Sequence, residues 1–91
     1  MQSRQKRLRV LKSGKIWLNG GVSAFECTIR NVSLGGAGVD VPRVVELPQM
    51  FWLESTGWPA RPCRLAWRRE DRIGVQFLDY DEGVSADGSS E

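Results

Sequence analysis

The chain is 91 residues long, carries a formal net charge of +2 and contains no histidine. This length suffices for one domain but not for two. The absence of histidine removes the commonest general base and the commonest metal ligand together, and the two cysteines have no CxxC spacing. The composition therefore disfavours enzymes and metal proteins, and we expect no catalytic residue, no metal and no cofactor.

Charge is distributed unevenly along the chain. Residues 1–15 carry six basic side chains and no acidic one, whereas residues 79–91 carry five acids and no base. This pattern predicts a flexible basic arm, residues 1–14, that meets an anion, and a disordered acidic tail, residues 81–91. No apolar run reaches the roughly 20 residues of a membrane span, and the basic start lacks the apolar stretch of a signal peptide. We therefore expect a cytoplasmic protein without a membrane partner.

Between the arm and the tail, residues 15–80, the apolar residues recur with period two, which indicates β-strands. A short strand is predicted at residues 15–18. Asn19-Gly20-Gly21 then predicts a hairpin turn, because Asn and Gly tolerate positive φ. The pattern predicts further strands at residues 23–30, 37–41, 50–53, 61–68 and 72–77.

Alternation also predicts which side chains face the core. About six short strands with frequent turns and no convincing helix indicate a small sandwich or barrel, and a barrel is favoured because closure leaves no exposed edge. Trp17 and Trp67 are interpreted as core residues, whereas Trp58 lies in a turn and is the tryptophan expected to be exposed to a partner. The inward positions are predicted to hold Phe25, Cys27, Ile29, Cys63, Leu65, Trp67, Ile73, Val75 and Phe77.

Two segments contain side chains suited to an anionic ligand. The first is the basic arm, where the planar fork of an arginine can hold a phosphate with two hydrogen bonds, stack on a purine or pair with O6 and N7 of guanine. The second is the segment from Asn31 to Gly36, where Asn and Ser can hydrogen-bond backbone groups and glycine permits unusual backbone conformations. Each segment taken alone also fits a plain structural role, a solvated tail and a turn without ligand.

In this order the two segments resemble the PilZ family, whose pattern is an Arg-x-x-x-Arg arm followed by (Asp/Asn)-x-Ser-x-x-Gly. The second half of that pattern is complete at Asn31, Ser33 and Gly36. Residues 61–77 also look like the late strands of short PilZ proteins, so that the resemblance spans nearly all of residues 4–78.

The arm departs from the family pattern. Counting back four residues from Arg7 gives Ser3, and counting back four from Arg9 gives Gln5, so neither register contains a complete Arg-x-x-x-Arg. Arg4 and Lys6 lie beside the vacant positions, and lysine can replace arginine only as a point charge.

The resemblance implies a six-stranded antiparallel β-barrel of Greek-key type that binds the bacterial second messenger cyclic di-GMP. In such a receptor the arm would become ordered over the ligand, and a downstream protein partner would read the new surface. By the same resemblance, Arg7 and Arg9 would contact phosphates and guanine faces, with Arg4 as an auxiliary. Asn31 would face a guanine edge. Ser33 would contact a phosphate or orient the loop, and Gly36 would let the backbone approach the ligand.

Two alternatives remain open. A PilZ-like adaptor could act through protein contacts without any ligand, with the incomplete arginine motif as its signature. A small barrel that binds single-stranded nucleic acid would combine a basic arm with outward aromatic side chains. The near-neutral net charge and the inward phase of most aromatic residues disfavour nucleic acid as a partner.

Overall fold

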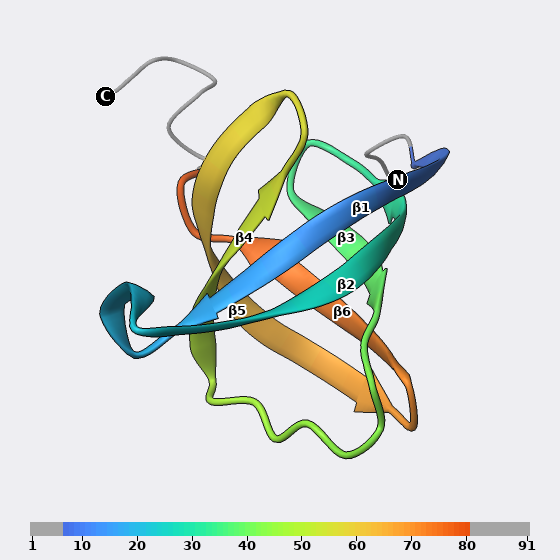
Figure 1. The fold of residues 1–91 in the computed structure, drawn as a ribbon. Helices are drawn as coiled ribbons and strands as arrows, with labels where there is room; N and C mark the ends of the chain where they lie inside the picture. The colour runs from blue at the N-terminus through green and yellow to red at the C-terminus, as the bar shows by residue number, and fades with distance from the viewer. Residues whose placement is uncertain (1–6, 81–91) are drawn as a thin grey trace.

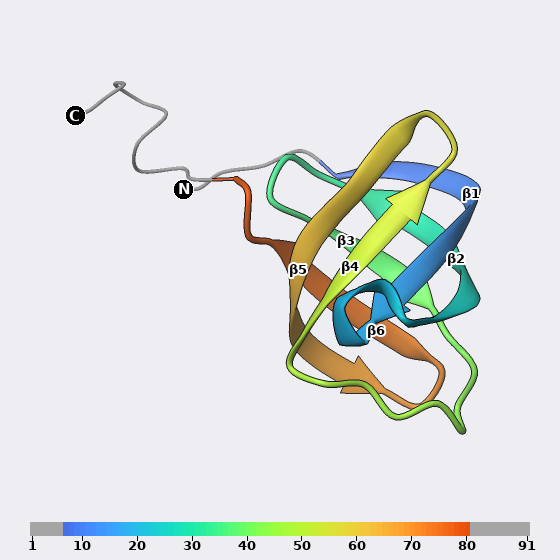
Figure 2. The same ribbon diagram turned by 60° about the vertical axis from the view of Figure 1, so that its left-hand side comes forward.

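The computed structural model describes residues 7–80, which form a closed six-stranded antiparallel barrel (Figure 1). The barrel expected from the sequence is thus confirmed. The strands follow one another around it in the order β1-β2-β3-β6-β5-β4, and β4 closes it by pairing with β1 (Figure 2). The elements are β1 (Leu8–Leu18), the 3-10 turn η1 (Asn19–Gly21), β2 (Ser23–Val32), β3 (Gly36–Asp40), β4 (Met50–Ser55), β5 (Trp58–Arg69) and β6 (Arg72–Phe77).

The first strand begins earlier than the sequence predicted. Residues 8–14 of the expected arm belong to β1, where Leu8 pairs with Val32 and Lys12 pairs with Ile29 of the long strand β2. A register shift between Arg9 and Lys12 interrupts the alternation, which hides the strand from a period-two pattern. Residues 1–6 of the arm and the predicted tail, residues 81–91, lie outside the described residues.

The barrel interior is filled by apolar side chains from all six strands. Most of the positions that alternation placed inward are buried, and each buried isoleucine, leucine or phenylalanine stabilises the fold by about 1.5–3 kcal/mol. Both cysteines are free thiols within this core. The buried apolar residues are Ile16, Cys27, Ile29, Ala37, Val39, Val41, Phe51, Leu53, Cys63, Ile73, Val75 and Phe77.

The tryptophans differ from the prediction. Trp67 is 50% exposed, because a register shift between Leu65 and Trp67 breaks the alternation of β5. Trp17 follows the fully buried Ile16 and lies on the outer side of β1, half-buried, where its indole N–H donates to Glu54 Oε1 at 2.7 Å. Trp58, expected to be exposed, packs edge-on against Phe77 with 6.1 Å between ring centroids.

The connection between β3 and β4 is long and runs past the end of β5 (Figure 1). Arg68, near that end of β5, holds it through backbone carbonyl groups. Its Nη2 donates to the carbonyl oxygens of Pro42 and Arg43, each at 3.1 Å, and its Nη1 donates to that of Val45. The described residues contain no helix long and apolar enough to cross a membrane.

Candidate functional site

One register row crosses five neighbouring strands of the barrel. It runs from Arg9 on β1 through Asn31 on β2, Gly38 on β3 and Gly74 on β6 to Trp67 on β5. Gly38 and Gly74, which we call the glycine floor, are direct partners in the middle of this row. A Cβ at Gly38 would lie 2.6 Å from Asn31 Nδ2, and one at Gly74 would lie 2.2 Å from Trp67 Nε1. Each flanking side chain therefore lies directly over one of the two glycines.

Two β-bulges place Asn31 and Trp67 over this floor. In β2 the register shifts between Ile29 and Asn31, and in β5 it shifts between Leu65 and Trp67. An extra residue on one strand turns the following side chain to the other face of the sheet. Without the two bulges, strict alternation from Ile29 and Leu65 would point Asn31 and Trp67 into the core.

Arg7, which immediately precedes β1, contacts the same place. Its guanidinium donates a hydrogen bond from Nη1 to the side-chain oxygen Oδ1 of Asn31. The two residues are far apart in the sequence, and the pairing of β1 with β2 brings them together. A cavity of about 260 Å³ lies here, and its lining includes Arg7, Asn31, Gly38, Trp67, Arg72 and Gly74.

Two further recesses adjoin this cavity. One recess, of about 450 Å³, is lined in part by Arg9, Arg30 and Asn31. The other, of about 520 Å³, lies beside Trp67. Arg72 lines both recesses. In the 260 and 450 Å³ recesses every charged lining residue is an arginine, so their electrostatic environment favours an anion. We call this surface the arginine site, consisting of Arg7, Arg9, Arg30, Asn31, Trp67 and Arg72 around the glycine floor.

Comparison with protein families gives the family of the chain. The model of the PilZ domain matches residues 2–87 of the chain. The chain belongs to the PilZ domain family. PilZ domains in general bind cyclic di-GMP and are binding or regulatory domains rather than enzymes.

Solved structures agree on the fold. The PilZ domain of CeSA from a cellulose-synthesizing bacterium has a TM-score of 0.68 and 16% sequence identity, covering 84% of this chain and 83% of that one. An uncharacterized Legionella protein has a TM-score of 0.57 and 19% identity, covering 85% and 81%. At these identities the likeness concerns the fold alone. No curated protein matches the chain.

Of the remaining motif residues of this PilZ domain, Ser33 lies in the turn from β2 to β3 and Gly36 is the first residue of β3. Ser33 donates its backbone N–H to the Gly36 carbonyl at 2.8 Å, and its Oγ lies 3.4 Å from the same oxygen. A Cβ at Gly36 would lie 2.3 Å from the carbonyl oxygen of Val75, so glycine is required here for the packing of β3 against β6. Contacts of Ser33 and Gly36 with a ligand stay predictions, and Arg4 lies outside the described residues.

Sequence reasoning missed several members of the arginine site. Trp67 was assigned to the core, and Gly38, Arg30 and Arg72 were not singled out. The available signal was the glycine inside the last strand, at position 74, which marks a close approach of another group. The approaching group, the Trp67 indole, becomes evident only once β5 and β6 are paired.

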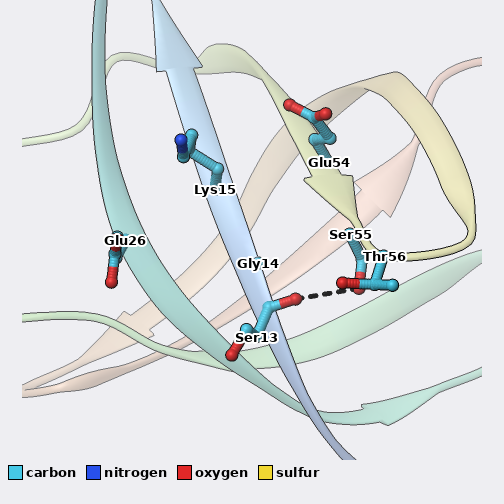
Figure 3. Close-up of a pocket in the computed structure, with 7 residues that line it drawn as sticks. All are labelled: Ser13, Gly14, Lys15, Glu26, Glu54, Ser55 and Thr56. Carbon is cyan, nitrogen blue, oxygen red and sulfur yellow. Dashed lines mark hydrogen bonds between the residues drawn. The ribbon is translucent and has the colours of Figure 1, made fainter.

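A separate recess, of about 230 Å³, lies over β1 and β4 (Figure 3). Ser55 Oγ donates to the carbonyl oxygen of Ser13 at 2.9 Å, and Glu26 and Glu54 lie on either side of the strand that carries Lys15 (Figure 3). Two carboxylates beside one ammonium group suit an anionic ligand less well than the arginine site does. The recess is lined by Ser13, Gly14, Lys15, Glu26, Glu54, Ser55 and Thr56.

Proposed function

We propose that this PilZ domain is a receptor for cyclic di-GMP and that the ligand lies on the arginine site. The observation that carries the proposal is the contact between Arg7 and Asn31 directly over the glycine floor. Cyclic di-GMP has two phosphates and two guanines. The site offers guanidinium groups for the phosphates, and the Asn31 amide and the Trp67 indole that cover its floor can pair with or stack on a flat base.

The phosphates are assigned to the arginines at the start of β1. Arg7 would exchange the amide oxygen of Asn31 for a phosphate oxygen, which is the stronger acceptor because it is charged. Arg9, the register partner of Asn31, reaches the same surface from β1. Each charge-assisted hydrogen bond contributes about 1.5–3 kcal/mol to binding. Arg4 is proposed as an auxiliary contact to the same ligand.

The guanines are assigned to the two side chains that cover the floor. The amide of Asn31, once released by Arg7, can pair with a guanine edge. Trp67, half of whose surface is exposed, can stack on a base, an interaction that contributes about 1–3 kcal/mol. Ser33 and Gly36 would shape the turn beside them and, in the case of Ser33, contact a phosphate.

The signal in this proposal is a rearrangement of the arm. Ligand binding would draw Arg7 away from Asn31 and order the residues before β1 over the ligand. A downstream protein partner in the cytoplasm would read the new surface. This rearrangement is tested by the amide NMR signals of residues 1–7, which precede β1 and should shift with saturating ligand.

The deciding experiment is isothermal titration calorimetry with cyclic di-GMP. The wild-type chain should bind with micromolar or tighter affinity, and an Arg7→Ala, Arg9→Ala double variant should bind at least tenfold more weakly. Arg43→Ala, which removes an exposed arginine from the β3–β4 connection, should bind like wild type. No heat from the wild-type chain, or equal binding by the double variant, would contradict the proposal.

A second function, a ligand-independent adaptor, is favoured by another surface of the barrel. A register row of outward residues joins Ala24, Trp17, Trp52 and Pro62 across β2, β1, β4 and β5. Trp52 is 44% exposed and Met50 beside it is 62% exposed, and both residue types are enriched in protein interfaces. The adaptor reading predicts no heat with cyclic di-GMP and loss of a captured protein partner in a Trp52→Ser variant.

A further inference from the structure

Asp40 holds two arginines at the edge of the arginine site. Asp40 on β3 is the register partner of Arg72 on β6, and Arg72 Nε lies 2.6 Å from Asp40 Oδ1. Arg30 approaches the other carboxylate oxygen, with 3.6 Å between its Nε and Asp40 Oδ2. One carboxylate therefore engages the Nε of both side chains.

This contact orients the terminal nitrogens of Arg72. Because Nε is engaged by Asp40, the two Nη groups at the end of the fork are left for another acceptor. Within residues 7–80 neither Nη group of Arg72 has a hydrogen-bond partner. The side chain is also 46% exposed, so a ligand can reach the fork from solvent.

Arg72 lies where the recesses of the site meet. It lines the 260 Å³ cavity and the 520 Å³ recess together with Trp67, and it lines the 450 Å³ recess together with Arg9 and Asn31. A base stacked on the exposed Trp67 ring would therefore have the Arg72 fork beside its edge.

We propose that Arg72, positioned by Asp40, selects guanine over adenine at the Trp67 side of the site. Guanine presents two acceptors, O6 and N7, on one edge, and an arginine fork donates to both. Adenine presents an amino donor in place of O6, so the same fork would face an unmatched N–H group. This inference rests on the proposed function, and it assigns an arginine outside the incomplete arm motif to nucleobase recognition.

The test compares two ligands, cyclic di-GMP and cyclic di-AMP, by calorimetry on the full chain. Arg72→Ala should weaken cyclic di-GMP binding by about tenfold or more and leave cyclic di-AMP binding much less changed. Arg72→Lys keeps the charge but not the fork, so it should retain part of the affinity and lose most of the preference for guanine. Arg64→Ala, an exposed arginine on β5 outside the site, is the matched control and should change neither.

The positioning role of Asp40 has its own readout. Asp40→Asn removes a negative charge near the ligand, which by itself would strengthen the binding of any anion. If Asp40 positions the fork, the ratio of cyclic di-GMP to cyclic di-AMP affinity should nevertheless fall. If the chain binds cyclic di-GMP but Arg72→Ala and Arg72→Lys leave its preference for cyclic di-GMP over cyclic di-AMP unchanged, this inference is overturned while the receptor function stands. A wild-type chain that binds neither ligand would overturn both.

Discussion

Gly38 and Gly74 are direct register partners on β3 and β6, and each is covered by one side chain from the next strand outward. Asn31 covers Gly38 and Trp67 covers Gly74. Any side chain at either glycine would occupy the space that the amide or the indole now fills. The local shape of the arginine site therefore depends on two residues that contribute no side chain.

The packing of Trp67 on Gly74 predicts a strong coupling between the two positions. Gly74→Ala would place a methyl group 2.2 Å from the indole Nε1, so the ring must move, at a cost of about 1–3 kcal/mol. In a Trp67→Ala background the ring is absent, so adding Gly74→Ala there should cost much less stability than it costs in the wild-type chain. Urea unfolding of the four chains measures the coupling, and strictly additive effects would contradict this packing.

Arg68 should be needed for the order of the β3–β4 connection. Its guanidinium donates to three carbonyl groups of that connection, so Arg68→Ala leaves those bonds unmade and should lower the free energy of unfolding by about 1.5–3 kcal/mol. Arg64→Ala, on the same strand but exposed, should cost little. Hydrogen exchange of residues 41–49 should accelerate only in the Arg68 variant, and unchanged exchange there would argue against the role.

Asp79 should make stability depend on pH in the acidic range. Hydrogen bonds donated by Arg61 lower the pKa of the Asp79 carboxyl below its ordinary value. A carboxyl whose pKa is lower in the folded chain than in the unfolded chain stabilises the fold at pH values above its unfolded pKa, which is near 4. This stability is lost as the pH falls through the pKa of the folded chain. The side chain is 43% exposed, so the contribution is below about 1 kcal/mol.

Thermal melting of Asp79→Asn tests this dependence. The variant should melt a few degrees below wild type at pH 7, and the difference should vanish once the wild-type carboxyl is protonated in both states. Asp71→Asn, an exposed carboxylate in the β5–β6 turn, is the matched control. A difference that persists unchanged into strong acid would mean that the effect is not one of charge.

The two thiols should be unreactive while the barrel is folded. Burial raises the pKa of Cys27 and of Cys63 to about 12, so both remain protonated at pH 8. A thiol-disulfide reagent should therefore modify them slowly in buffer and rapidly in urea. Cys27, at 8% exposure, should react before the fully buried Cys63. Fast reaction of both thiols under native conditions would contradict their burial.

The sequence by itself determined the strand content and most of the core. Alternation found five of the six strands nearly at their observed positions, and it placed Cys27, Ile29, Cys63 and Ile73 correctly inside. It could do so because a strand with one face buried repeats its apolar residues with period two. The Asn-x-Ser-x-x-Gly segment likewise indicated the PilZ family, which the family match confirmed.

The tertiary structure alone decided how the site is assembled. A bulge arises when one strand has an extra residue opposite its partner, so it depends on the register between two strands and is not visible in either one. Two such bulges turned Asn31 and Trp67 outward, and the pairing of β3 with β6 aligned Gly38 with Gly74 and Asp40 with Arg72. The two residues of each β3–β6 pair are far apart in the chain, and only the pairing of these strands brings them together.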